Sequence, residues 1–153
     1  MELLREIHRC IFTGVRGHAG RHRARDFGAE HLVFGPHRSS HRAKVEAELG
    51  ALFERIRYKL RELGDNIEAL NYDEEWMRFA IWAHAKIIRI HPFEDGNGRS
   101  CRLLMDHLLV VLSLKPIPVE ACKQEYIETL NTYMLTRNIQ PLLDLFLRLY
   151  VAS

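Results

Sequence analysis

The amino-acid sequence predicts an all-α protein with one non-helical segment. Six stretches of the chain repeat apolar residues at steps of three and four, which places those residues on one face of a helix. Glycine is concentrated between residues 14 and 35, where the helical pattern stops. Of the 153 residues, 47% are hydrophobic and 27% are charged, as in an average globular domain. We therefore expect residues 1–153 to form a single domain of about six or more helices.

Three helices are expected before residue 91. Apolar residues from Leu3 to Phe12 define the first helix, which Gly14 ends. The second helix is expected from Ser40 to about Leu63, and the third from about Tyr72 to Ile90. Asp73 is well placed to cap the first turn of the third helix.

Three more helices and a hairpin complete the predicted fold. The helices are expected from about Asn97 to Leu112, from Glu120 to Leu135 and from Pro141 to Tyr150, the last with proline in its first turn. Between the first two helices of the chain, residues 27–29 and 32–34 are expected to pair as a short β-hairpin.

The segment from Arg16 to Lys44 is basic and rich in histidine. Aromatic residues, which stack on bases in single-strand binding proteins, are sparse in it, and the net charge of the chain is only +2. We interpret the segment as a solvated face or a docking surface for an acidic partner, and we expect no direct nucleic-acid binding. The spacing of its five histidines matches no zinc signature, so we expect no metal there.

The cysteines and the apolar runs bear on the compartment. The three cysteines contain no CxxC pair, so neither a disulfide framework nor a zinc site is predicted. The first residues lack the apolar core of a signal peptide. The longest apolar run, residues 108–112, is far shorter than the roughly 20 residues that a spanning helix requires. We expect a cytoplasmic protein without membrane contacts.

The stretch His-Pro-Phe-Glu-Asp-Gly-Asn-Gly-Arg-Ser-Cys-Arg, residues 91–102, carries the candidate chemistry. Pro92 predicts the end of one helix at His91, because proline disfavours the helical conformation in the residue before it. The Gly-Asn-Gly sequence at 96–98 then opens the next helix. Glycines let the backbone approach a ligand closely, and the unpaired amides at a helix N-terminus favour phosphate.

Four side chains around this turn complete a catalytic set. Arg99 and Arg102 share one helix face and offer two permanently charged groups to phosphate oxygens. Asp95 is placed to hold Mg²⁺ that bridges phosphates, and His91 can take a proton from an incoming hydroxyl. These parts suit the transfer of a phosphorus group to a hydroxyl. A GxxxxGK[ST] sequence is absent, so the chain is not a P-loop enzyme.

Other polar residues receive structural interpretations. His84 lies on a helix with an apolar stripe and is expected to form a structural hydrogen bond. His8 and His107 are expected to be incidental. Cys101 is expected to be a packed small residue, although the neighbouring arginines could lower its pKa.

The same stretch resembles the signature of the Fic family, HPFx[DE]GNGRxxR, at every specified position. The similarity extends to the flanking helices and, weakly, to Gly20-Arg21-His22-Arg23, which resembles the start of that family's target-binding flap. The resemblance implies a Fic fold, with the helices arranged around a central motif helix and a β-hairpin flap. It also implies the transfer of AMP from ATP to a protein hydroxyl, with release of pyrophosphate.

The resemblance assigns a role to each motif residue. His91 would deprotonate the target Ser, Thr or Tyr, and Asp95 would bind Mg²⁺ between the α and β phosphates. Phe93 would anchor the loop by packing beneath it. The phosphate-binding residues would be Gly96, Asn97, Gly98, Arg99 and Arg102, with the Asn97 side chain on the α-phosphate and the arginines on the outer phosphates.

The base pocket and the flap are carried over in the same way. Candidates for the nucleotide base are Tyr126, Asn131 and Met134. The flap would pair with a segment of the target protein as an added strand, and its candidate residues are Arg25, Phe27, Gly28, Leu32 and Val33.

Many Fic proteins inhibit themselves through a helix with the pattern [ST]xxxE[GN], whose glutamate pairs with the second motif arginine. No Ser or Thr of this sequence has Glu four residues later. We expect either a separate antitoxin chain that supplies the glutamate or an uninhibited enzyme, and the length suits a bare Fic core. An effector of this family would be delivered to a host cell. The alternatives are transfer of UMP, phosphate or phosphocholine, and a catalytically idle binding module.

Overall fold

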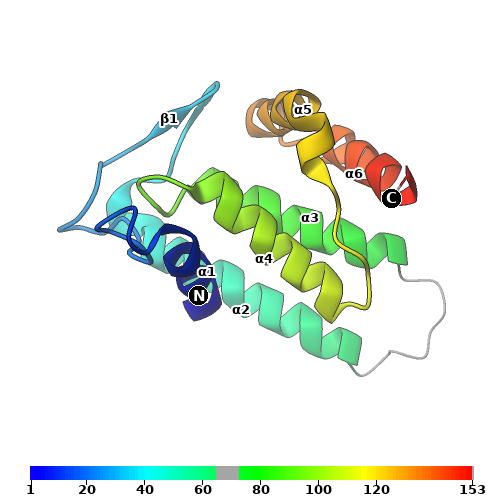
Figure 1. Cartoon of the computed structure of the whole chain (residues 1–153), viewed down its shortest axis with the longest axis horizontal. Coiled ribbons are helices and arrows are strands. Elements are labelled where there is room, and N and C mark those ends of the chain that lie inside the picture. Colours follow the sequence, from blue (N-terminus) through cyan, green and yellow to red (C-terminus); the bar gives the residue numbers. More distant parts are fainter. Residues whose placement is uncertain (65–72, 153) are drawn as a thin grey trace.

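The computed structural model describes residues 1–64 and 73–152, and within them it shows six α-helices and one small hairpin (Figure 1). The helices are α1 (Glu2–Phe12), α2 (Val45–Gly64), α3 (Asp73–Ile90), α4 (Asn97–Val111), α5 (Lys123–Thr136) and α6 (Gln140–Ala152). Short 3₁₀ turns, η1 (Arg42–Lys44) and η2 (Val119–Cys122), precede α2 and α5. The all-α prediction is confirmed.

The helix boundaries agree with the sequence except at two starts. The second helix was expected from Ser40, but His41 is extended and its Nδ1 accepts a hydrogen bond from the N–H of Ala43, which caps η1 instead. The fifth helix was expected from Glu120, where the structure has the 3₁₀ turn η2. The expected start of the third helix at Tyr72 lies outside the described residues.

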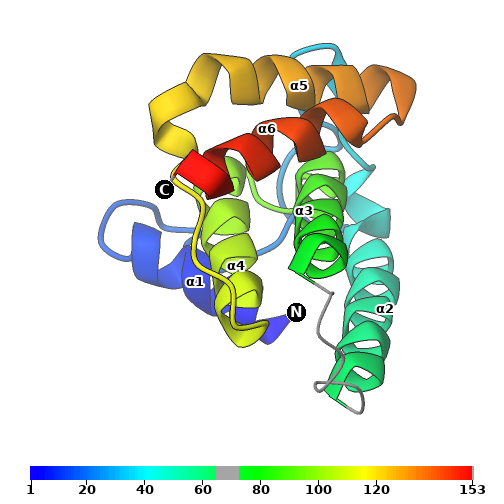
Figure 2. The ribbon, with the colours of Figure 1, turned by 90° about the vertical axis from the view of Figure 1, so that its right-hand side faces the viewer.

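The helices α3 and α4 form the centre of the core. Small residues on α3, Ala80, Ala83 and Ala85, are fully buried and let neighbouring helices approach closely. The helices α1 and α2 cover one side of this pair. Figure 2 shows α5 and α6 lying crosswise over the ends of α3 and α4. The loop between α3 and α4 is thereby left between α1, the hairpin and the start of α5.

The hairpin joins β1 (Val33–Phe34) to β2 (His37–Arg38) in antiparallel register. The prediction that residues 27–29 pair with 32–34 was wrong. Gly35 adopts φ +52° in the two-residue turn, a conformation that glycine tolerates. The hairpin therefore turns at Gly35, further along the chain than predicted. Residues 27–29 bond elsewhere, since Arg42 donates to the Gly28 carbonyl and the Ala29 N–H to Glu94.

No helix among residues 1–64 and 73–152 has both the length and the apolar character needed to cross a membrane.

Candidate active site

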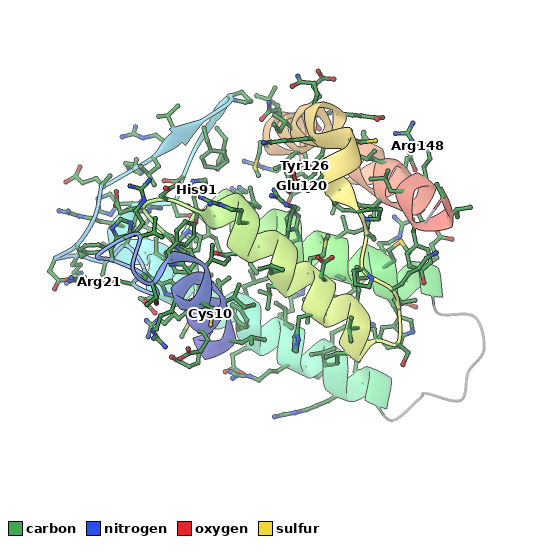
Figure 3. All side chains as sticks on the ribbon, in the orientation of Figure 1. Cys10, Arg21, His91, Glu120, Tyr126 and Arg148 are labelled. Carbon is green, nitrogen blue, oxygen red and sulfur yellow. The ribbon has the colours of Figure 1, made fainter. Side chains whose placement is uncertain are left out.

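A cavity of about 630 Å³ opens at the N-terminus of α4. Eight of the twelve signature residues line it, together with one residue of η2 and the first residue of α5. The lining residues are His91, Glu94, Asp95, Gly96, Asn97, Gly98, Arg99, Arg102, Glu120 and Lys123. Figure 3 shows His91 between the hairpin and α4, with Glu120 on the facing segment. The predicted catalytic, metal and phosphate-binding residues are therefore brought together in one place.

His91 follows the last residue of α3 and has a backbone φ of +56°. Its Nδ1 lies 3.3 Å from the carbonyl oxygen of Ile88. A carbonyl only accepts hydrogen bonds, so Nδ1 carries the proton and Nε2 keeps a free lone pair. Burial lowers the pKa of His91 to about 4, which makes the imidazole neutral near pH 7. This tautomer and charge are those of a group ready to accept a proton.

The hairpin covers the His91 ring. Phe34 stacks on the imidazole with 4.0 Å between ring centres and 20° between planes. The tip of the hairpin reaches α5, because a Cβ on Gly35 would meet the side-chain amide of Asn131. Phe34 had no predicted role in the site. The position of its ring depends on the turn at Gly35, which the sequence pattern placed elsewhere.

Phe93 is fully buried, as expected of a packing anchor. The prediction that His8 is incidental was wrong: His8 is also fully buried and stacks on Phe93 with 3.8 Å between ring centres. The Gly20 N–H donates to Nδ1 of His8, so Nε2 is protonated and donates to the carbonyl of Asp95 at 3.0 Å. The spacing of His8 and Phe12 on one face of α1 is the signal that places His8 inside.

The N-terminus of α4 is built around Gly96. This residue has φ +73°, and a Cβ on it would overlap the ring of Phe12. Asn97 is buried, and its side chain accepts a hydrogen bond from the Phe93 N–H at 2.9 Å and donates to the Phe93 carbonyl at 2.8 Å. In this structure the Asn97 side chain therefore clamps the loop. The first backbone amides of α4 have no acceptor within the helix, an arrangement that favours binding of an anion.

Asp95 presents its carboxylate at the rim of the cavity. The Gly96 N–H donates to its Oδ1 at 2.6 Å and the Arg16 guanidinium pairs with its Oδ2 at 3.1 Å, and both interactions hold the pKa of the carboxyl below its usual value. Mg²⁺ is commonly held by one or two carboxylates together with substrate phosphates. One accessible carboxylate beside an anion site fits that pattern, provided that Arg16 moves away from Oδ2.

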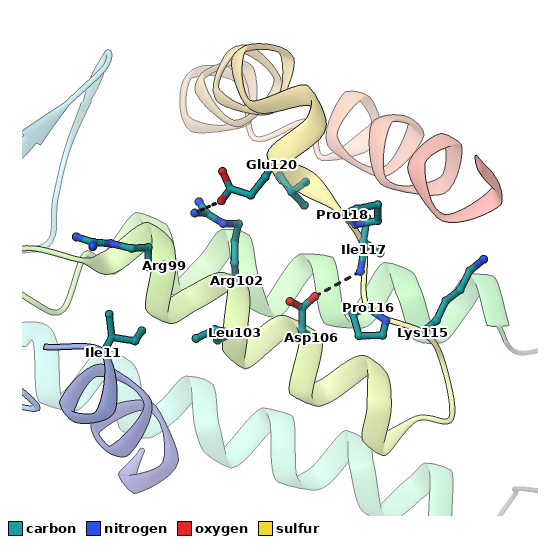
Figure 4. Close-up of a pocket in the computed structure, with 11 residues that line it drawn as sticks. Ile11, Arg99, Arg102, Leu103, Asp106, Lys115, Pro116, Ile117, Pro118 and Glu120 are labelled. Atoms are coloured by element: carbon teal, nitrogen blue, oxygen red, sulfur yellow. Dashed lines mark hydrogen bonds and ion pairs between the residues drawn. The ribbon is translucent and has the colours of Figure 1, made fainter. Parts of the chain in front are cut away.

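The two motif arginines lie at different depths. Arg99 is exposed, and its guanidinium lies 4.5 Å from the centre of the Phe12 ring. Arg102 is largely covered, and its Nη2 pairs with the Glu120 carboxylate at 2.6 Å (Figure 4). A second cavity of about 740 Å³, lined largely by apolar groups, continues from these residues along α4. We assign the site to the smaller cavity because His91 and the N-terminus of α4 line it.

The base candidates are not among the residues that line the cavity. Tyr126 and Met134 are buried, while Asn131 contacts the hairpin tip. His84 donates from Nδ1 to the Cys101 carbonyl at 3.1 Å, and its Nε2 accepts from the Tyr126 hydroxyl at 2.8 Å, which confirms the structural hydrogen bonding expected of His84. The base contact stays a prediction.

The flap candidates are spread over two turns. Phe27 forms an isolated bridge with Ala24 and lies under the Arg21 guanidinium, whereas Val33 is exposed on the hairpin. Arg25 lies in the turn between Ala24 and Phe27, and Gly28 and Leu32 lie in the loop that leads to the hairpin. The strand-addition role of all five stays a prediction.

Burial corrects two expectations about charge. Cys101 is fully buried and packed, as expected, but burial raises its pKa, so the arginines do not activate its thiol. Arg23 was counted with the solvated basic segment, yet its side chain is fully buried. Among the described residues, no group of three or more His, Cys, Asp or Glu is arranged to hold a metal ion.

Comparison with solved structures identifies the fold. The chain superposes on BepC, an effector protein of Bartonella tribocorum with bound AMPPNP, with a TM-score of 0.79 at 21% identity over 97% of this chain and 72% of that one. A Fic domain of Bartonella quintana with bound ADP gives a TM-score of 0.80 at 22% identity over 99% and 76%. At these identities the likeness shows the fold alone.

Sequence relatives extend the comparison. The protein adenylyltransferase Fic of Nematostella vectensis is 31% identical over 129 residues, which is 82% of this chain and 26% of that protein. The protein of the same name from Drosophila mojavensis is 32% identical over 124 residues, 79% of this chain and 22% of that protein. The chain therefore spans about a quarter of the length of these relatives. The model of the Fic/DOC family matches residues 1–109, and with the signature built into the site, this chain belongs to the Fic/DOC family.

Proposed function

We propose that this chain is a Mg²⁺-dependent protein adenylyltransferase that transfers AMP from ATP to a hydroxyl side chain of a target protein. The observation that carries the proposal is the shared cavity of His91 and the N-terminus of α4. In this arrangement the neutral imidazole accepts the proton of the attacking hydroxyl, and the backbone amides bind the oxygens of the α-phosphate that the hydroxyl attacks. The relatives named protein adenylyltransferase, at 31% to 32% identity, support this activity over others of the family.

The transfer follows from these groups. The target hydroxyl oxygen forms a bond to the α-phosphorus, and the bond from that phosphorus to the bridging oxygen breaks, so that pyrophosphate leaves. His91 accepts the hydroxyl proton at Nε2, because Nδ1 is already protonated. The amides of α4 stabilise the charge on the α-phosphate, and Arg99 and Arg102 bind the outer phosphates. Mg²⁺ held by Asp95 would neutralise charge on the α and β phosphates.

The target protein docks on the flap in this proposal. Val33 is 77% exposed on a two-stranded hairpin, whose outer edge can pair with an extended segment. Phe34 lies between that edge and the His91 ring, so the bound segment would deliver its hydroxyl past the Phe34 ring. A cytoplasmic location and a separate antitoxin chain stay predictions.

Isotope position in ATP tests the reaction. The protein is incubated with a cell lysate, Mg²⁺ and ATP labelled either at the α or at the γ phosphate. Adenylyl transfer labels protein only from the α position. Label from the γ position alone would show that the protein is a kinase. Transfer from labelled UTP or CDP-choline would show that it transfers UMP or phosphocholine instead of AMP. Absence of transfer in every arm, with ATP bound, would indicate an idle binding module.

A further inference from the structure

Arg23 is a buried cation that forms no direct ion pair among the described residues, and the Glu94 carboxylate acts on its charge only from a longer distance. Its side chain is fully buried, and the ion pairs of residues 1–64 and 73–152 do not include it. A buried charge costs several kcal/mol unless other groups compensate it. Such a residue needs an explanation that a solvated basic segment does not provide.

The direct hydrogen bonds to the guanidinium come from five backbone carbonyls. Nη2 of Arg23 donates to His91 at 2.7 Å and Nε donates to the same oxygen at 2.9 Å. The remaining acceptors are the carbonyls of Ile90 at 3.2 Å, Ser40 at 3.1 Å, Ala29 at 3.1 Å and Glu30 at 3.4 Å. A guanidinium has five N–H groups in a fixed plane, so this pattern uses the geometry that distinguishes arginine from lysine.

Two of these carbonyls end the helix α3. The carboxyl end of a helix carries partial negative charge, which favours a cation there. The backbone N–H of Arg23 also donates to the Pro92 carbonyl at 2.7 Å. Arg23 therefore holds three consecutive carbonyls, those of Ile90, His91 and Pro92, at the point where the chain leaves α3.

His91 is the residue that needs such support. A non-glycine residue at φ +56° is strained by about 1–2 kcal/mol and keeps that conformation only where its surroundings enforce it. The forked contact from Arg23 fixes the orientation of the peptide that follows His91. Because Cα and the side chain turn with that peptide, the contact also keeps Nδ1 within reach of Ile88 and directs Nε2 away from it.

The other three carbonyls, those of Ala29, Glu30 and Ser40, belong to the flap stem, the two segments that lead into and out of the hairpin. The same guanidinium thus joins the flap to the base, since movement of the stem changes the acceptors that compensate the charge. We infer that Arg23 is the positioning residue for His91, and that it couples the place of the flap to the orientation of the imidazole. The inference rests on the proposed function for the role of His91 as the base.

Conservative variants at Arg23 test the inference against a role in stability alone. Arg23→Lys keeps the charge but cannot donate two hydrogen bonds from a planar group to the His91 carbonyl, and Arg23→Gln removes the charge. Arg42→Lys is the matched control, because Arg42 donates to the Gly28 carbonyl in the same flap segment and makes no contact with His91. For Arg23→Lys we expect kcat for α-label transfer to fall about 10- to 100-fold, as for a base displaced by about 1 Å, with the Kd for ATP changed less than about threefold. Arg42→Lys should stay near the wild-type kcat.

A spectroscopic arm is independent of activity. In the wild type, ¹⁵N shifts should show His91 as the Nδ1–H tautomer, whereas Arg23→Lys should shift the ring toward the Nε2–H tautomer that free imidazole side chains prefer. If the wild type transfers no AMP, the proposed function fails while this arm still tests the positioning. Unchanged kcat and an unchanged tautomer in Arg23→Lys, with only a lowered Tm, would overturn the inference.

A measurement on the wild-type protein tests the inference even if Arg23→Lys and Arg23→Gln both fail to fold. The Nε–H proton of Arg23 should exchange slowly with solvent and should show through-bond coupling to the His91 carbonyl carbon. Rapid exchange of that proton in the folded protein would overturn the inference as firmly as an active variant.

Discussion

The guanidinium of Arg102 and the carboxylate of Glu120 form an ion pair at 2.6 Å, in the cavity where the outer phosphates of ATP are proposed to bind. Arg102 belongs to the second turn of α4 and Glu120 to η2, and Figure 4 shows the ion pair between them. Because both residues line the cavity, the pair places a negative group next to Arg102 there. An anion that binds Arg102 has to displace this carboxylate.

Glu120→Gln should therefore tighten ATP binding. The Glu120 side chain is 69% exposed, and exposed ion pairs contribute about 0.2–1 kcal/mol, so we expect the Kd to fall by up to about fivefold. Isothermal titration calorimetry at constant ionic strength measures it. Glu125→Gln is the matched control, because Glu125 makes an ion pair of equal length with Arg148 and is not among the residues that line the cavity. Equal tightening in both variants would point to net charge rather than to this pair.

His91→Ala should lower transfer by at least about 100-fold, because it removes the proposed base, while ATP binding is largely retained. A filter-binding assay beside the α-label assay separates the two effects. Loss of ATP binding in His91→Ala would mean that His91 holds the nucleotide.

The acid limb of the rate should lie well below the usual pKa of histidine. Burial lowers the pKa of His91 to about 4, so the imidazole stays neutral and able to accept a proton as the pH falls through 6.5. We expect kcat/KM to be level between pH 8 and about 5 and to fall toward a midpoint near 4, in a stopped assay over short times. A midpoint near 6.5 would show that the ring is solvated when substrate binds.

The buried His84 makes stability depend on pH. Its pKa is about 4 in the folded protein, against 6.5 when exposed, so the unfolded chain binds more protons between those values. Stability from His84 is therefore present above pH 6.5 and is lost progressively as the pH falls toward 4, by up to about 3 kcal/mol.

Urea unfolding at pH 7 and pH 5 measures this loss, and His84→Gln should reduce the difference between the two pH values. His107→Gln, at an exposed position of α4, should leave the difference as it is in the wild type. His91, whose pKa burial also lowers to about 4, keeps part of the difference in His84→Gln, so a difference of unchanged size would place the titrating group elsewhere.

Gly96→Ala should damage both the fold and the site. A methyl group on Gly96 would overlap the Phe12 ring, and φ +73° is unfavourable for alanine, so we expect a loss of about 1–3 kcal/mol in the free energy of unfolding and weaker ATP binding. Gly50→Ala is the control, because a Cβ there meets nothing within 4 Å in the helix α2. That variant should gain about 0.5–1 kcal/mol. An unchanged ATP affinity in a folded Gly96→Ala protein would contradict the anion site.

The helices and the loop that carries the signature could be predicted because their signals are local. The apolar period of α3, its stop before Pro92 and the glycines at 96 and 98 all lie within a few residues of the structure they determine. Phe93 was placed correctly from the family signature, and its full burial confirms that role.

The residues that were misplaced depend on distant parts of the chain. Arg23 looks like one more exposed arginine until α3 brings its terminal carbonyls against it. His8 supports the loop only by stacking on the ring of Phe93, which lies 85 positions further along the chain. The hairpin shifted because the conformation of Gly35 and the bonds of residues 27–29 are set by tertiary contacts. Long-range pairing leaves no periodic mark in a sequence.

The contact between Gly35 and Asn131 has a consequence for the order of folding. It joins the hairpin near the beginning of the chain to α5 near its end, so the cover over His91 closes a long loop of intervening chain. Contacts of such separation form late, since the loop entropy is lost before the contact compensates for it. The helices α3 and α4, which are neighbours along the chain, can therefore assemble before the hairpin closes over His91.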